Sequence, residues 1–342
     1  MALKASIFNT STAYYNHGTH ALAYFLESQG WQVEQFTNQP DLFNFGADLF
    51  CFSAIFTWDL PRLAEWVNRV KDFGEVWIGG PAPSAMPKYV EQMTGIKPFV
   101  GFDTRFENQP GYYKITRTSR GCPVGCSFCI VPKIDGKAMI EYSDFPIAPV
   151  VMDDNILACS VKHQEKVIGR LLSQEYRSVD LQSGFEPSYF DQDAFDRFSR
   201  LPMKFWRLAF DTISEEKPVM EMMRLLREAG IKDSRRIRVY CLSGNEPFEQ
   251  CHHRAEKIIE WGGEPHVQAL IPLNALEKKP VVQSRFGWTE QKLTDFGRYY
   301  NRWLWRKPGR SFEWYKADGR SRLHVSAQQV VAGDLLPLRL FE

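Results

Sequence analysis

The sequence predicts an α/β fold, with an open parallel sheet at the N-terminus, then an incomplete (βα)6 barrel and a C-terminal helical cap. Short apolar runs alternate with helix-period segments twice, before and after a polar, turn-rich stretch at Asp103–Gly111. Several of these runs are continuously apolar, as parallel strands covered on both faces require. A chain of 342 residues, 44% of them hydrophobic, has enough material for more than one core. We therefore predict domains at residues 1–110, 111–284 and 285–342.

The first 110 residues are predicted to form a Rossmann-like or flavodoxin-like open sheet. Thr19–Gln29 has helical periodicity and is followed by Gly30, a frequent helix stop. Pro61–Phe73 is a second helix, with proline in its first turn. The predicted strands are Lys4–Phe8, Trp31–Phe36, Asp48–Ile55 and Glu75–Ile78, with Ile96–Val100 as a fifth.

A second βα series follows the polar stretch and predicts the partial barrel. Six strands spread over about 160 residues suit an incomplete relative of the eight-fold barrel. The predicted strands are Tyr112–Thr118, Val150–Asp153, Ser178–Gln182, Phe205–Phe210, Arg236–Leu242 and His266–Ile271. The predicted helices between them are Lys162–Ser173, Lys217–Glu228 and Gln250–Trp261.

Three cysteines stand close together just after the first strand of this series. Cys122, Cys126 and Cys129 have the spacing C-x3-C-x2-C, and neighbouring glycines and a proline let the loop curl. Three thiolates at this spacing can hold one soft metal centre and leave a coordination position open. Two alternatives remain, a zinc site and three unrelated loop thiols; the scattered remaining cysteines and histidines offer no standard fourth zinc ligand.

This loop resembles the signature of the radical S-adenosylmethionine (SAM) superfamily, in which an aromatic residue precedes the last cysteine, here Phe128. The resemblance covers the chain from Tyr112 to about Pro272. It implies a [4Fe-4S] cluster on the three cysteines, SAM bound to the free iron, and reductive cleavage of SAM to a 5′-deoxyadenosyl radical. It also implies a flavodoxin- or ferredoxin-type electron donor.

The resemblance assigns further cofactor-binding residues at strand ends. Asp154 and Asn155 end the second strand, where relatives place polar groups against the methionyl amine, although the Gly-Gly-Glu form of that motif is absent. Gln182 ends the third strand, Asp211 ends the fourth, and Gly244 lies in the turn after the fifth. The alternative for each polar residue is an ordinary hydrogen bond at the barrel mouth.

The N-terminal domain resembles the cobalamin-binding domain of one radical SAM subgroup. The turn Gly79-Gly80-Pro81 matches the Gly-Gly-Pro turn of that domain, where glycines let the backbone approach a cofactor. No Asp-x-His-x-x-Gly motif follows the first strand. Cobalamin is therefore a further candidate cofactor, and the alternative is a domain that keeps the fold without the cofactor.

The C-terminal stretch combines basic and aromatic residues. From Arg298 to Arg322 there are eight Lys or Arg residues, interleaved with Tyr, Trp and Phe. Such a stretch can grip single-stranded nucleic acid or can cap a partial barrel with its aromatics inward. We favour the cap, because helices with a solvated basic face are common.

Bulk properties set the outer limits. A net charge of +1 selects no partner, the first residues do not form a signal peptide, and no apolar stretch is long enough to span a membrane, so we expect a cytoplasmic protein. The leading hypothesis is a radical SAM enzyme acting on a C–H bond of an unknown substrate, with cobalamin-dependent methyl transfer as one outcome. The alternatives are a nucleic-acid-modifying enzyme of the same superfamily and a non-catalytic iron–sulfur or zinc protein. Cys241 is a minor candidate for a hydrogen-atom donor.

Overall fold

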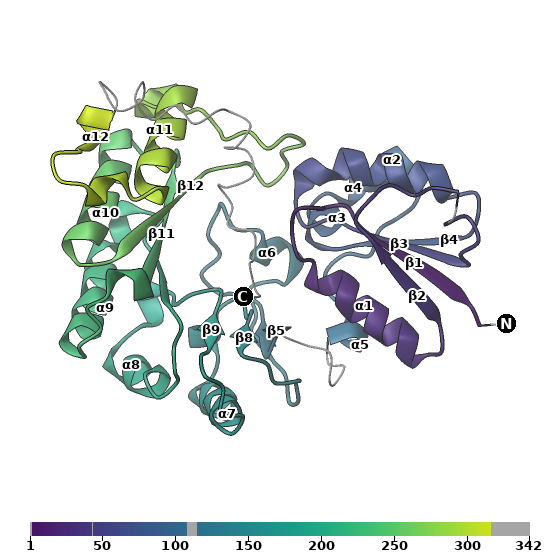
Figure 1. Cartoon of the computed structure of the whole chain (residues 1–342), viewed down its shortest axis with the longest axis horizontal. Coiled ribbons are helices and arrows are strands. Elements are labelled where there is room, and N and C mark those ends of the chain that lie inside the picture. Colours follow the sequence, from purple (N-terminus) through teal and green to yellow (C-terminus); the bar gives the residue numbers. More distant parts are fainter. Residues whose placement is uncertain (1, 43, 108–114, 316–342) are drawn as a thin grey trace. The chain divides into compact units, whose positions relative to one another are not determined.

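The computed structural model describes residues 2–42, 44–107 and 115–315, and its fold is mixed α/β with parallel sheets (Figure 1). The chain divides into two compact units. The first contains residues 2–148 and Pro272–Lys279; the second contains Pro149–Ile271 and the described residues from Pro280 onward. The predicted boundary at 110/111 lies outside the described residues.

The first unit is built on a four-stranded parallel sheet of order β2-β1-β3-β4. Its strands are β1 (Lys4–Asn9), β2 (Gln32–Phe36), β3 (Leu49–Ser53) and β4 (Glu75–Gly79). The four predicted strands are thus confirmed within two residues. The fifth, Ile96–Val100, is wrong: Phe99 N donates to Ile78 O (2.8 Å), but the segment forms no strand.

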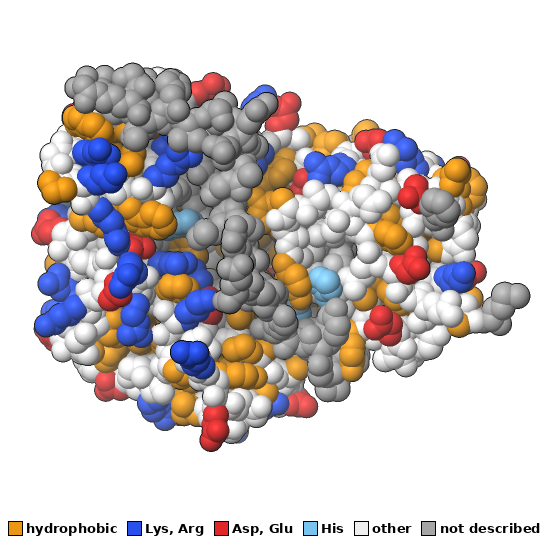
Figure 2. All heavy atoms as spheres, in the orientation of Figure 1, with side chains coloured by type: hydrophobic (Ala, Val, Ile, Leu, Met, Phe, Trp, Pro, Cys, Tyr) orange, Lys and Arg blue, Asp and Glu red, His pale blue; other side chains and the backbone are white. Residues whose placement is uncertain are grey.

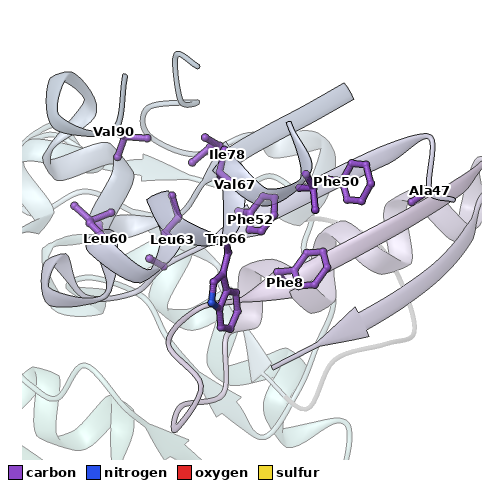
Figure 3. Packing of buried hydrophobic residues seen from close by; sticks show 13 residues of the cluster. Phe8, Ala47, Phe50, Phe52, Leu60, Leu63, Trp66, Val67, Ile78 and Val90 are labelled. Atoms are coloured by element: carbon purple, nitrogen blue, oxygen red, sulfur yellow. The ribbon is translucent and has the colours of Figure 1, made fainter. Parts of the chain in front are cut away.

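Helices cover both faces of this sheet. Trp66 of α2 (Leu60–Val70) lies edge-on to Phe8 of β1, and Phe8 stacks on Phe52 of β3 at 4.9 Å between ring centroids (Figure 3). The opposite face packs against Leu26 of α1 (His17–Ser28). Full burial of an apolar side chain of this size stabilises the folded state by about 1.5–3 kcal/mol. Burial on both faces explains why β3 is apolar at every position except its last. The remaining helices are α3 (Pro81–Ala85), α4 (Pro87–Thr94) and α5 (Thr104–Glu107).

The end of the first unit contains a small hairpin that the sequence analysis did not predict. Strand β6 (Ser119–Arg120) pairs antiparallel with β7 (Ile140–Glu141), and the short helix α6 (Val131–Ile134) lies between them. Within the predicted strand Tyr112–Thr118, the described residues form only β5 (Ile115–Thr116).

The second unit contains parallel strands in sequence order. Strands β8 (Val150–Val151) and β9 (Asp180–Leu181) pair, and β10 (Trp206–Ala209), β11 (Ile237–Ser243) and β12 (Glu264–Ala269) form a three-stranded sheet. Isolated parallel bridges, Val179↔Met203 and Phe185↔Leu208, join the two sets. Five of the six predicted barrel strands lie here, and their assembly into a radical SAM barrel stays a prediction.

The helices of the second unit are α7 (Val161–Leu172), α8 (Gln192–Phe198), α9 (Glu216–Glu228), α10 (Phe248–Glu260), α11 (Glu290–Asn301) and the short α12 (Phe312–Trp314). The sequence analysis missed α8, which is only seven residues long. Short 3-10 turns in the two units are η1 (Thr57–Asp59), η2 (Ile156–Ala158), η3 (Pro187–Tyr189), η4 (Ile213–Glu215), η5 (Ser234–Arg236), η6 (Ser284–Phe286) and η7 (Leu304–Arg306). Every helix in the described part of the chain is too short or too polar to cross a lipid bilayer.

Helix α11 lies within the predicted C-terminal cap, and it covers the edge of β12. The Asn301 side chain accepts from Val267 N and donates to Val267 O, both at 2.8 Å, so it replaces a neighbouring strand. Tyr299 and Tyr300 are buried, while Trp303 is 50% exposed. On the face drawn in Figure 2, Lys and Arg side chains are frequent over this unit. Inward aromatics favour the cap over a nucleic-acid platform for the described residues.

Candidate functional site

The cysteine loop is the excursion between β6 and β7. The hairpin register, Ser119↔Glu141 and Arg120↔Ile140, fixes the two ends of the loop next to each other. Inside the loop, Cys122 N donates to Gly136 O at 3.2 Å, and Cys129 N donates to Cys126 O at 3.1 Å. The second bond closes a tight turn over the C-x2-C half of the motif. The loop is therefore an ordered structure built from its own backbone.

Two glycines in the loop have left-handed backbone, and at one of them there is no room for a side chain. Gly121 has φ +90°, and a Cβ placed there would lie 2.1 Å from Ala138 O. Gly125 has φ +71°, and its Cβ would lie 2.8 Å from the flexible end of Lys137. Both positions need left-handed backbone, which only glycine adopts freely. The sequence analysis predicted this use of glycine, and the structure confirms it at both positions.

A buried ion pair ties the loop at its ends. Arg120 Nη1 lies 2.6 Å from Asp135 Oδ1, and the two side chains are 11% and 2% exposed. The Arg120 guanidinium also lies over the Phe102 ring, 4.4 Å from the centroid. The sequence analysis missed this pair, since residues fifteen apart with no helical or strand periodicity between them give no signal.

The three thiols of the loop are partly buried and none is in a disulfide. Within the described residues, no three or more His, Cys, Asp and Glu side chains are gathered closely enough to hold a metal ion. The three cysteines of the loop are among these residues, and the finding bears on a zinc site as much as on an iron–sulfur cluster. The donor set itself, three cysteines without a disulfide on a glycine-shaped loop with Phe128 beside the last one, is of the kind that holds an iron–sulfur cluster.

The structure brings together two of the residues predicted at strand ends. Asp211 follows β10, and its Oδ1 accepts from Leu242 N of β11 at 2.9 Å. Asn245 Nδ2 donates to Asp211 O at 2.6 Å, so the turn that holds Gly244 is bonded directly to the end of β10. Gly244 has φ +86°, and its Cβ would meet no atom closer than 3.4 Å; backbone conformation therefore explains the glycine.

A buried arginine organises these strand ends, and the sequence analysis missed it. Arg254 of α10 is 0% exposed and donates to Phe210 O and, at 2.8 Å, to Leu242 O. Its Nε lies 3.2 Å from Glu246 Oε2. One side chain thus holds the ends of β10 and β11 and the turn after them. The sequence signal was a single arginine on the apolar face of an amphipathic helix.

Cys241 lies on the covered face of β11, beside this arginine. Its Sγ is 3.1 Å from Arg254 Nη1, and the side chain is 0% exposed. Burial raises the pKa of the Cys241 thiol to about 12. The hypothesis of a hydrogen-atom donor required an inward-facing thiol, and a thiol packed beneath α10 does not meet that requirement.

Asp211 has the chemistry of a proton-holding group. Burial raises its pKa to about 7, and the nearby Glu215 carboxylate adds to the rise. The hydrogen bond from Leu242 N and the Arg254 charge act in the opposite direction. Burial also raises the pKa of Glu215. Near neutral pH, Asp211 therefore populates both its protonated and its ionised form.

The other predicted cofactor residues lie at the carboxyl ends of β8 and β9. Asn155 is the N-cap of η2, and its side-chain oxygen accepts from Ala158 N at 3.3 Å. Asp154 beside it is partly buried. Gln182 N donates to Val151 O at 2.9 Å, which places Gln182 at the end of β9 with a partly buried side chain. The cap accounts for Asn155 structurally, and the SAM contacts of all three stay predictions.

Near the carboxyl ends of β1 and β3, at the switch point of the first sheet, polar side chains are hydrogen-bonded to one another. Ser11 Oγ donates to Asp59 Oδ2 at 2.7 Å, and Asn16 Nδ2 donates to Ser53 Oγ at 3.0 Å, all in partly or fully buried positions. Gly80 has φ +102°, and a Cβ there would lie 2.5 Å from Ser53 Oγ. The Gly-Gly-Pro turn is thus explained by packing against the end of β3. Cobalamin binding by the first unit stays a prediction.

Comparison with known proteins adds no assignment. Neither a protein-family model nor a curated protein matches the chain. Two solved structures align over 80% of it: one of a protein from Mycobacterium smegmatis, at 11% identity, 82% of that chain and a TM-score of 0.17, and uroporphyrinogen III synthase from Thermus thermophilus, at 13% identity, 96% and 0.16. Scores this low carry no argument about fold or function. The class defined by the fold is therefore a mixed α/β protein with parallel sheets.

Proposed function

We propose that this protein is a radical SAM enzyme that holds a [4Fe-4S] cluster on Cys122, Cys126 and Cys129 and cleaves SAM reductively. One observation carries the proposal: a C-x3-C-x2-C loop whose turn at Gly121 excludes every side chain and whose three thiols are free of disulfides. The spacing C-x3-C-x2-C favours the proposal over a loop of unrelated thiols, because it is the spacing that the resemblance assigns to the cluster.

The chain's own residues have distinct tasks in this proposal. When bound, the cluster supplies an electron and an open iron for the amino and carboxylate groups of SAM. The three cysteines bind the cluster, and the Arg120–Asp135 pair orients the loop that carries them. Asp211 holds a proton at Oδ beside the turn of Gly244, and Arg254 positions both. A flavodoxin- or ferredoxin-type protein is the proposed electron donor.

The test is anaerobic reconstitution of the full chain with iron and sulfide, followed by reduction in the presence of SAM. The wild-type protein is expected to contain about four irons per chain and to form 5′-deoxyadenosine. Each of Cys122→Ala, Cys126→Ala and Cys129→Ala is expected to reduce 5′-deoxyadenosine to background, because the cluster loses one of its three protein ligands.

Cys51→Ala is the matched control, since Cys51 is a buried thiol in the core of the first sheet. It is expected to keep both iron and product. Zinc in place of iron, or iron without 5′-deoxyadenosine, would leave the non-catalytic alternative standing. Loss of the cluster in Cys51→Ala would contradict the assignment of the ligands.

A further inference from the structure

Strand β11 separates an apolar face from a charged one. Its residues alternate in burial, with Val239 and Cys241 buried and Arg238, Tyr240 and Leu242 partly exposed. Helix α10 covers the buried face of β11 and β12. Because neighbours in a parallel sheet point the same way, the other face carries the side chains in register with Arg238 and Tyr240.

Most charges on this second face are paired within the unit. Arg207 of β10 makes two hydrogen bonds of 2.7 Å to Asp180 of β9, from Nε and Nη2. Glu264 of β12 is paired with Arg306. Each pair combines one positive and one negative charge, so neither leaves a net charge on the face.

Arg238 is the charge left over. Its guanidinium lies 3.6 Å from the centroid of the Phe205 ring, which holds it in place. Within the described part of the chain, no carboxylate reaches ion-pairing distance of it. Burial and the neighbouring Arg207 lower the pKa of Arg238, while the charges of Glu264 and Asp180 act in the opposite direction.

Two neutral donors stand on the same face. Arg207 Nη1 donates to the Tyr240 hydroxyl oxygen at 2.9 Å, so the hydroxyl keeps its own hydrogen to donate. The His266 ring lies edge-on to Tyr240, with 5.3 Å between the centroids. Burial lowers the pKa of His266 to about 4, and the ring is therefore neutral at pH 7 and offers one N–H. The face combines one cation with two neutral donors.

We infer that this face binds an anionic oxygen group, a carboxylate or a phosphate ester, of a small-molecule substrate, with Arg238 as the charge partner and Tyr240 and His266 as donors. That the ligand is the substrate rests on the proposed function. Arg238 is four residues before Leu242, the contact of Asp211, which is about 13 Å along a strand. Arg238, the charge partner in this site, is thus separated from the strand end assigned to SAM.

The experiment measures the melting temperature of the reconstituted full chain in sodium acetate, sodium phosphate and sodium chloride at equal ionic strength and pH 7. Acetate probes a carboxylate and phosphate a phosphate ester, and at least one is expected to raise the melting temperature above its value in chloride. The larger shift identifies the group. Arg238→Gln is expected to lose at least two thirds of that shift, and Arg238→Lys to keep most of it.

Arg235→Gln is the matched control. Arg235 is an exposed arginine just before β11, paired with Asp233, and its variant is expected to keep the full shift. Tyr240→Phe is expected to reduce the shift and decides the matter should Arg238→Gln fail to fold. The inference is overturned if the wild type shows no shift, or if Arg238→Gln and Tyr240→Phe both keep the full wild-type shift.

A separate readout keeps this result apart from the proposed function. Arg238→Gln is expected to form 5′-deoxyadenosine from SAM at the wild-type rate when no substrate is present. An Arg238-dependent shift in a wild-type protein that forms no 5′-deoxyadenosine would retain the anion site and refute the radical SAM assignment.

Discussion

The cysteine loop of the first unit and the Ser243–Glu246 turn of the second share three features but differ in the partners of their arginines. Each follows a strand, contains a left-handed glycine and is anchored by a buried arginine, Arg120 in one and Arg254 in the other. Arg120 is paired with Asp135 across the two ends of its loop, whereas Arg254 comes from the next helix and bonds to main-chain carbonyls.

The difference lies in what each arrangement leaves available. In the cysteine loop the ties lie toward its ends, and its middle carries three thiols that form no disulfide. In the second turn the polar atoms are used internally: Gly244 O accepts from Gln283, and Glu246 O accepts from the Trp288 indole. We therefore expect the cysteine loop to bind a ligand through its side chains, and the Ser243–Glu246 turn to act as a rigid support. The predictions below test this contrast.

The largest expected effect is that of Asp135→Asn. It removes the charge opposite a buried Arg120 without changing size, and breaking a buried pair in this way costs about 3–5 kcal/mol. We expect the unfolding free energy of the first unit to fall by about that amount and the iron content after reconstitution to fall with it. Urea denaturation and iron analysis measure the two effects.

Asp103→Asn is the control for Asp135→Asn, because Asp103 forms a more exposed pair with Arg105, whose side chain is 60% exposed. It is expected to cost less than about 1 kcal/mol. A loss below 1 kcal/mol in Asp135→Asn would mean that the loop is held by its backbone alone.

A smaller effect is expected from alanine at the loop glycines. Gly121 and Gly136 both have positive φ, +90° and +81°, but only Gly121 has a neighbour in the way. Gly136→Ala is expected to cost about 1–2 kcal/mol through backbone strain. Gly121→Ala adds displacement of Ala138 O, and so we expect it alone to lose the cluster in an iron assay. Equal iron in both variants would show that the curl at Gly121 is not required.

Local sequence patterns predicted most helices and strands, but they did not predict the contacts between residues far apart in the chain. The apolar run Asp48–Ile55 contains strand β3, which is covered on both faces, and the cysteine spacing is visible in the sequence alone. The hairpin β6–β7 consists of two-residue strands without a pattern, and its pairing depends on tertiary structure. Arg238 could have been found, since the alternation along Arg236–Leu242 places it on the face of Tyr240. Arg254 stood out as a single arginine on the apolar face of its helix, but its partners Phe210, Leu242 and Glu246 could not be predicted, because tertiary structure brings them together.

The last prediction separates the turn of the second unit from the cysteine loop through the pH dependence of stability. Burial raises the pKa of Asp211 from 3.8 to about 7, and so the folded protein keeps a proton that the unfolded chain releases near pH 4. Between about pH 4 and pH 7 the folded state therefore binds more protons, and its stability falls as the pH rises, by at most about 1.4 kcal/mol per pH unit. Asp211→Asn is expected to flatten this fall without abolishing it, because burial raises the pKa of Glu215 too. Urea denaturation at pH 5 and pH 8 measures the slope, with Asp193→Asn on the exposed side of α8 as the control. A wild-type slope in Asp211→Asn would mean that this carboxyl group is ionised in the folded protein at pH 5, and the strand end would then lack the proton-holding group assigned to it.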